Sequence, residues 1–210
     1  MISFMKSVPK PTYLLISILI FIFGSFIFEY YQVTNYSTII LYSLIFISTY
    51  FSMEKKSNVM KALLFIGLFL NLFIFVSSNK YLQLSVLLIS ALIFTFIAFV
   101  LIGQIAKSKK VNSYILIEAI NGYLLIGIII TLLNSLLLLT DNNAINFTTK
   151  PNLSDIIYYS YINLTSIGFG DIVPKAQFAK KISIFTGISG QLYLAIIIAL
   201  IVGKLNTSKQ

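Results

Sequence analysis

Six long runs of apolar residues, separated by short polar gaps, constrain the fold of this chain more than any other feature. A helix needs about 20 predominantly apolar residues to cross a bilayer. The chain is 58% hydrophobic and only 10% charged, far from the balance of a soluble domain. Glycine and proline are sparse inside the runs, as expected for helices that satisfy their own backbone in lipid. We therefore predict an all-α integral membrane protein with six transmembrane helices, at Tyr13–Phe28, Ser37–Met53, Val59–Val76, Tyr81–Ala106, Ser113–Leu139 and Ile182–Gly203.

The absence of two particular residue types from the sequence removes several classes of function. The chain has no cysteine and no histidine, which removes disulfides, thiolate metal sites and the usual proton shuttle. No clustered pair of acids and no inverted repeat lies within the runs, which argues against a membrane enzyme or a proton-coupled transporter. We expect no enzymatic activity and no cofactor. A purely structural membrane subunit is a further class that liposome flux would separate from a channel.

The lysines predict the orientation in the membrane. The formal net charge is +9, and all the basic residues are lysines. Because lysines concentrate on the cytoplasmic side, we expect both termini there, in a multi-pass protein of the plasma membrane. A lysine-, asparagine- and isoleucine-rich composition hints at a bacterial source. The lysines on the predicted inner side are Lys6, Lys10, Lys55, Lys56, Lys61, Lys107, Lys109, Lys110, Lys204 and Lys209, against Lys80, Lys150, Lys175, Lys180 and Lys181 on the outer side.

The gap between the last two runs contains a second informative pattern, Thr165-Ser166-Ile167-Gly168-Phe169-Gly170-Asp171. Two glycines at alternate positions allow a backbone with positive φ, which turns successive carbonyls the same way. Upstream, Asn152 or Ser154 can cap a short helix with Asp155 in its first turn. The run that follows is too short to cross a bilayer, so a re-entrant helix is predicted at 153–164.

The segment Tyr158–Asp171 (YYSYINLTSIGFGD) resembles the pore helix and selectivity filter of tetrameric potassium channels, whose signature is Thr-X-Gly-(Tyr or Phe)-Gly. The resemblance continues through Ile172-Val173-Pro174 to about Lys204. It implies that the carbonyls of Ser166, Ile167, Gly168 and Phe169, with the Ser166 hydroxyl, replace the water shell of a permeating K⁺ ion. It also implies a homotetramer, because one chain supplies one quarter of the ring. A glycine-rich extracellular turn is the plainer alternative.

Three features depart from the family pattern. Ser166 stands where threonine is usual, and Phe169 lacks the hydroxyl of the commoner tyrosine. Tyr158 and Tyr159 occupy positions often held by tryptophan, and we expect them to support the filter. Ile162 stands where some members place a glutamate that braces the aspartate, here Asp171 at the outer mouth. The resemblance implies potassium over sodium selectivity. The alternative is a weakly selective cation pore that acts as a toxic membrane effector and is gated by a separate cytoplasmic anionic ligand or partner.

The last run contains candidate gating residues. Gly187 and Gly190 can form a hinge or a close helix contact. Tyr193, Ile197 and Ile201 follow a helical spacing and can narrow the cytoplasmic end, although a lipid-facing or intersubunit stripe explains the same pattern. Glu118 is the one acid well inside a run; it can pair with Lys110 or Lys204, or act in gating.

The predicted domain organisation follows. Residues 1–106 form a peripheral four-helix bundle with the layout of a voltage sensor, yet Tyr81–Ala106 holds no lysine or arginine, so voltage sensing is not expected. Residues 107–112 are a short cytoplasmic linker, 113–203 the pore domain with filter 165–171 and inner helix 182–203, and 204–210 a tail. No folded cytoplasmic regulatory domain is expected. An anionic lipid, nucleotide or oligonucleotide could bind Lys55, Lys56, Lys61, Lys107, Lys109 and Lys110.

Overall fold

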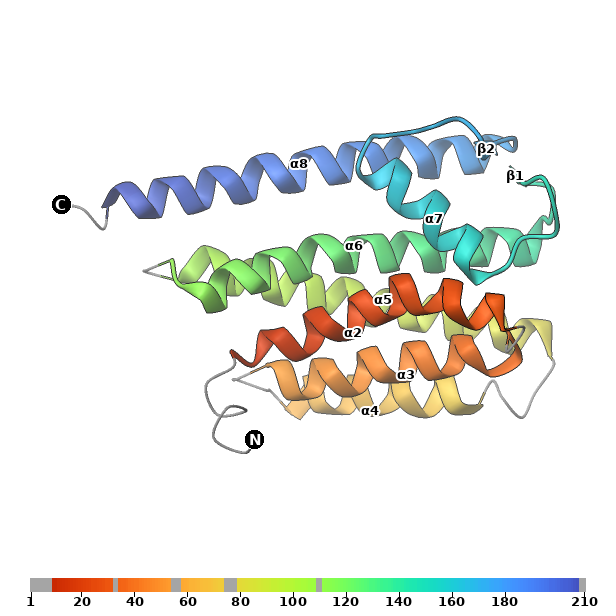
Figure 1. The fold of residues 1–210 in the computed structure, drawn as a ribbon. Helices are drawn as coiled ribbons and strands as arrows, with labels where there is room; N and C mark the ends of the chain where they lie inside the picture. Colours follow the sequence, from red (N-terminus) through yellow and green to blue (C-terminus); the bar gives the residue numbers. More distant parts are fainter. Residues whose placement is uncertain (1–8, 32–33, 54–57, 74–78, 109–110, 208–210) are drawn as a thin grey trace.

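The long helices of the chain lie side by side in a bundle, and one short helix lies at one end of this bundle (Figure 1). The computed structural model describes residues 9–31, 34–53, 58–73, 79–108 and 111–207. The helices are α2 (Pro11–Tyr30), α3 (Thr34–Ser52), α4 (Asn58–Phe73), α5 (Lys80–Lys107), α6 (Ser113–Thr140), α7 (Leu153–Leu164) and α8 (Gln177–Thr207), and the strands are β1 (Ile145–Asn146) and β2 (Val173–Pro174).

Among the described residues, four helices are long and apolar enough to cross a membrane: α2, α5, α6 and α8. Helices α3 and α4 are apolar but shorter, with 19 and 16 residues. At 1.5 Å per residue, α4 spans about 24 Å, less than the roughly 30 Å of a hydrocarbon core. The structure therefore supports four of the six predicted crossings, and those of α3 and α4 remain predictions.

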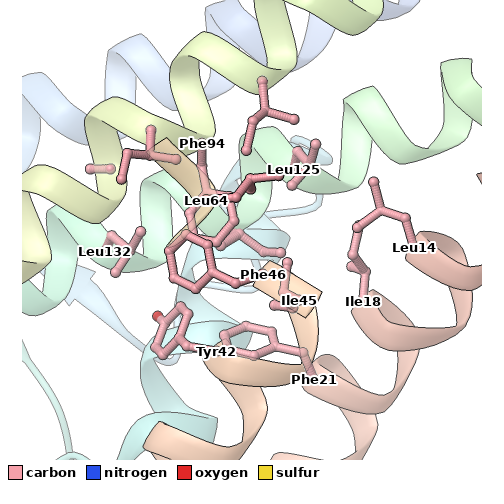
Figure 2. Packing of buried hydrophobic residues seen from close by; sticks show 14 of the residues in the cluster. Leu14, Ile18, Phe21, Tyr42, Ile45, Phe46, Leu64, Phe94, Leu125 and Leu132 are labelled. Atoms are coloured by element: carbon pink, nitrogen blue, oxygen red, sulfur yellow. The ribbon is translucent and has the colours of Figure 1, made fainter. Parts of the chain in front are cut away.

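Helices α2 to α5 share one apolar core, which Figure 2 shows at close range. The rings of Phe46 and Phe94 stack with their centroids 4.7 Å apart. Gly67 on α4 makes room for this pair, because a Cβ there would lie 2.4 Å from the Phe46 ring. The bundle is thus held by close packing between large apolar side chains.

The bundle packs against α6 of its own chain. Leu125, Ile128 and Leu132 of α6 belong to the same buried core as the residues of α2 to α5. At the N-terminus of α2, the Asn121 side-chain amide of α6 donates to the Pro11 carbonyl at 2.8 Å. This agrees with the short connection between α5 and α6, which leaves little reach for the bundle to pack elsewhere.

Helix α7 slants between α6 and α8 at the end of the molecule opposite the last turns of α8 (Figure 1). Asn134 of α6 donates to the Ser160 hydroxyl at 2.9 Å, and the Tyr161 hydroxyl donates to the Leu124 carbonyl at 2.7 Å. A Cβ at Gly127 would meet the Tyr161 ring at 2.3 Å, so this glycine is required for the close approach. Strands β1 and β2 pair antiparallel and join the two connections that flank α7.

Helix α8 begins at Gln177, five residues before the Ile182 start that the sequence predicts, and ends at Thr207. The polar residues Gln177, Lys180 and Lys181 lie in this extra length. The hydropathy pattern marks only the apolar part of a helix, so it misses the turns that continue beyond it. Helix α8 is therefore longer than the predicted inner helix by about one turn at its N-terminus and about one turn at its C-terminus.

Candidate functional site

The N-terminus of α7 is closed by a capping box. The Asn152 side chain accepts from the Asp155 amide at 2.9 Å, and the Asp155 carboxylate accepts from the Asn152 amide at 3.1 Å. Of the two caps that the sequence allows, Asn152 is the one used. The capping box satisfies the free N–H groups at the N-terminus of α7. The partial negative charge of the helix dipole lies at its other end, beside Leu164.

The filter segment, Thr165–Asp171, follows α7 directly and has an alternating backbone. Ser166, Gly168 and Gly170 have φ values of 58°, 53° and 82°. Among the described residues, Ser166 is the one non-glycine residue with positive φ. Such a conformation costs on the order of 1–3 kcal/mol for a residue with a Cβ. The sequence predicts this backbone at the two glycines and misses it at Ser166, although the two-residue period extends there.

Hydrogen bonds tie the start of the filter segment to the end of α7. The amides of Ile167 and Gly168 both donate to the Ile162 carbonyl, at 3.0 and 3.2 Å. The Ser166 amide donates to the Asn163 carbonyl at 3.1 Å. The N–H groups are thus turned back toward α7, which leaves the main-chain oxygens of the segment for other partners.

The filter segment lies on the surface of the single chain. Ile167 is 58% exposed and Phe169 is 71% exposed. A Cβ at Gly168 or Gly170 would meet no atom within 4 Å. Backbone strain and an exposed apolar surface are both typical of functional or interaction sites.

Two tyrosines of α7 brace this region. The Tyr158 hydroxyl donates to the Asp171 carboxylate at 2.7 Å, which joins α7 to the far end of the filter segment. This hydrogen bond, with smaller contributions from desolvation and the negative charge, raises the pKa of the Tyr158 phenol. The hydroxyls of Tyr159 and Ser183 lie 2.7 Å apart and link α7 to α8.

Gln191 of α8 is a site residue that the sequence analysis misses. Its side-chain amide donates to the Ser166 hydroxyl at 3.0 Å. The sequence assigns that hydroxyl to the permeating ion; the structure gives it a protein donor as well. A glutamine after a glycine in a long apolar run carries no motif, so only the fold brings it to the filter segment.

The two glycines of α8 differ in their surroundings. A Cβ at Gly190 would lie 2.0 Å from the Leu164 carbonyl oxygen, a backbone atom that cannot move aside. A Cβ at Gly187 would meet nothing closer than 3.9 Å. Of the two alternatives, hinge or close contact, this geometry favours a close contact between α8 and the end of α7 at Gly190.

The gate predicted at Tyr193, Ile197 and Ile201 is not supported. Tyr193 and Ile197 are buried among residues of α5 and α6, with Ile201 packed against the same cluster. The Tyr193 hydroxyl donates to the Ala119 carbonyl at 2.6 Å, in space that Gly122 leaves open. In the single chain these side chains therefore fill the contact between α8 and its neighbours α5 and α6. Their role as a gate stays a prediction.

The surroundings of Glu118 and of its suggested partner Lys204 are as follows. Glu118 is 1% exposed on α6. Lys204 donates to the Ile105 and Ala106 carbonyls and to the Ser108 hydroxyl, so it closes the C-terminal end of α5. Lys110, the other suggested partner, lies outside the described residues.

Glu29, at the end of α2, is a second residue that the sequence analysis misses. Its carboxylate accepts hydrogen bonds from the Asn152 amide group and from the Ser154 hydroxyl. It therefore connects the peripheral bundle to the capped N-terminus of α7. The sequence shows only an acid at the end of an apolar run, 123 residues from its partner.

Of the six lysines suggested for an anionic partner, the structure describes two. Lys61 is half-buried in the first turn of α4, and Lys107 is exposed in the last turn of α5. Lys55, Lys56, Lys109 and Lys110 lie outside the described residues. That partner stays a prediction.

Comparison with known proteins places the site in context. Residues 120–206 match a family model described as an ion channel. The matched range covers most of α6, α7, the filter segment and nearly all of α8. No solved structure matches the chain. The matched part of the chain, which carries the filter segment, is therefore similar to ion channels, and the four long apolar helices indicate a membrane protein.

Proposed function

We propose that the protein is a potassium-selective channel of the plasma membrane, formed by four copies of this chain and not gated by voltage. The observation that carries the proposal is the alternating positive φ at Ser166, Gly168 and Gly170 in a segment tied to the end of a short capped helix. This alternation is the backbone arrangement that presents a column of carbonyls to a dehydrated cation.

In this proposal, the main-chain oxygens of residues 166–169 coordinate K⁺ in turn. The C-terminal end of α7 contributes a partial negative charge, on the order of half an elementary charge, toward an ion below the filter. Asp171, held by Tyr158, stands at the outer mouth and concentrates cations there. Gln191 of α8 donates a hydrogen bond to the Ser166 hydroxyl, near the inner end of the filter segment.

Two features support assembly into a ring. The filter segment is exposed in the single chain, most clearly at Ile167 and Phe169. In addition, α8 is the least buried of the four candidate spans: 22% of its most apolar stretch is buried, against 39–50% for the other three. A closed fourfold arrangement would cover this face of α8 and align four filter segments on one axis.

The absence of voltage gating rests on α5. From Tyr81 to Ala106 the helix carries no lysine or arginine, so it offers no charge for the membrane potential to move. Passive conduction without steep voltage dependence is therefore expected.

The test is a reversal-potential measurement on the purified chain in planar bilayers. With K⁺ on one side and Na⁺ on the other, the reversal potential should shift far from zero, in the direction that opposes K⁺ flow down its gradient. A reversal potential near zero with current still flowing would instead indicate the weakly selective pore. No current at all, from protein that is folded and inserted, would contradict the channel itself.

A further inference from the structure

A cavity of about 770 Å³ lies away from the filter segment, between α3, α4, α5 and α6 and under the connection from α6 to α7. Its volume is within the roughly 300–1,000 Å³ of small-molecule sites. The proposed conduction pathway makes no use of it.

The depth of the cavity corresponds to one leaflet of a membrane. Its deepest helical residues are Ser90, ten residues into α5, and Leu132, eight residues before the end of α6. At 1.5 Å per residue, these lie about 12–15 Å from the helix ends. Half of a hydrocarbon core is also about 15 Å. The cavity thus reaches from the level of the headgroups into the region of the acyl chains.

The walls divide by chemistry along this depth. The helical part is lined by aliphatic side chains, among them Val86, Leu132 and Leu138, together with uncharged polar ones such as Gln83, Ser90 and Ser135. Asn71, which also lines it, donates to the Ile39 carbonyl and the Ser43 hydroxyl. The part beyond the helix ends is richer in polar residues and holds the charged ones, with Asn142, Asn143, Asn146, Thr149 and Lys150 beside Ile145 and Phe147. This division matches an amphiphile with its chain inward and its headgroup outward.

The charges of the lining select the headgroup. Two lysines line the cavity, Lys150 and Lys175, and no carboxylate does. Pairing of β1 with β2 fixes Lys175 there, and its amide donates to the Ala144 carbonyl at 2.9 Å. Asp141, Asp155 and Glu29 lie close by and accept hydrogen bonds from Asn143, Asn152 and Ser154, but none of the three lines the cavity. The charge that the lining itself carries is therefore positive.

We propose that this cavity binds a single-chain amphiphile with an anionic headgroup, the acyl chain lying between α5 and α6 and the headgroup meeting Lys150 and Lys175. The site also touches the conduction half of the chain, because Asn152, Leu153 and Ile156 of the α7 cap and first turns line it. Binding does not depend on conduction, so the two proposals fail independently.

The experiment is native mass spectrometry of the full chain in a neutral detergent, titrated with lysophosphatidylglycerol. Lysophosphatidylcholine tests the headgroup charge, palmitate tests carboxylate against phosphate, and inorganic phosphate tests the need for a chain. The proposal expects the two anionic amphiphiles to bind, lysophosphatidylcholine to bind on the order of tenfold more weakly, and inorganic phosphate not to compete. Competition by inorganic phosphate, or equal binding of lysophosphatidylcholine, would overturn it.

Two variants locate the site. The double variant Lys150→Gln/Lys175→Gln should lose on the order of tenfold in affinity, while the matched double variant Lys180→Gln/Lys181→Gln, on exposed α8 positions outside the cavity, should lose none. Ser135→Phe, which narrows the cavity between α5 and α6 with both lysines intact, should weaken binding. An equal loss in both lysine variants, or unchanged binding in Ser135→Phe, would show that the amphiphile binds elsewhere and would overturn the proposal.

Discussion

At the scale of single residues, the conformation of the filter segment depends on two glycines and one strained serine. Gly168 and Gly170 accept positive φ at no steric cost, whereas Ser166 holds it against the preference of its Cβ. Contacts on both sides of Ser166 hold this conformation: its amide bonds to Asn163, and its hydroxyl accepts from Gln191. Positions of this kind are maintained where the surrounding structure over-determines them, which is typical of functional sites.

The first prediction concerns these glycines. Gly168→Ala should remove most of the K⁺ flux, since an alanine at φ 53° costs about 1–2 kcal/mol in every chain. No atom lies within 4 Å of the added Cβ in the single chain, so strain rather than collision within the chain is the cause. Liposome flux measures the effect.

Gly103→Ala is the matched control. Gly103 lies in α5, its added Cβ also meets nothing within 4 Å, and its φ is not positive. This variant should retain full flux and gain up to about 1 kcal/mol of stability from the better helix former. Full flux in Gly168→Ala would contradict the role given to the positive φ.

The second prediction concerns Tyr158. Tyr158→Phe removes the donor to Asp171 and should shorten openings, because about 1 kcal/mol of bracing at the outer end of the filter segment is lost. Single-channel recording reports the open time. Tyr81→Phe, at a residue 80% exposed in α5, should change nothing. Open times as long in Tyr158→Phe as in the parent chain would show that this hydrogen bond does not hold the filter segment.

At the scale of elements, α7 was predictable and its partners were not. Its bounds, Leu153–Leu164, equal those predicted, because the cap, the apolar run and the glycines are all encoded within twenty residues. Glu29 of α2 contacts the N-terminus of α7, and Gln191 of α8 contacts Ser166 just after its C-terminal end. Both are distant in sequence, and no local pattern predicts them. The faces of α8 were equally unreadable, since an apolar helix gives no amphipathic signal.

The third prediction concerns the connection from α2 to α7. Glu29→Ala removes the acceptor of Asn152 and Ser154 and should lower the free energy of unfolding by about 1.5–3 kcal/mol, the range for hydrogen bonds to a charged group. A thermal unfolding scan of the purified protein measures this loss. Ser154→Ala removes one of the two bonds and should cost less. Equal midpoints for Glu29→Ala and the parent would mean that α7 is positioned without α2.

The fourth prediction separates the two glycines of α8. Gly190→Ala should destabilise the protein by about 1–3 kcal/mol, because its Cβ would overlap the Leu164 carbonyl and push α8 away from α7. Gly187→Ala has room for its Cβ and should be neutral or slightly stabilising. The thermal midpoints of the two variants decide the matter: a destabilised Gly187→Ala beside an unchanged Gly190→Ala would refute the close contact and reopen the hinge.

At the scale of the whole molecule, α6 is the helix that both the bundle of α2 to α5 and the pair α7 and α8 contact. The two groups also meet directly, because Glu29 of α2 binds the N-terminus of α7 and Tyr193 of α8 packs in one cluster with Ile105 of α5. Hydropathy predicted this helical membrane architecture because lipid requires it, but it overestimated how plainly α3 and α4 would span. The large cavity at the α7 end was not predictable, since it is formed by four helices and a connection.

The account depends on four copies of the filter segment meeting around one axis. The most direct measurement is a single-particle reconstruction of the purified assembly in K⁺. We expect fourfold symmetry, with Gly168 and Gly170 of every chain beside the axis, ion density between their carbonyls, and the exposed face of α8 covered by a neighbouring chain. An assembly in which these glycines lie away from the axis, facing lipid or solvent, would contradict the account.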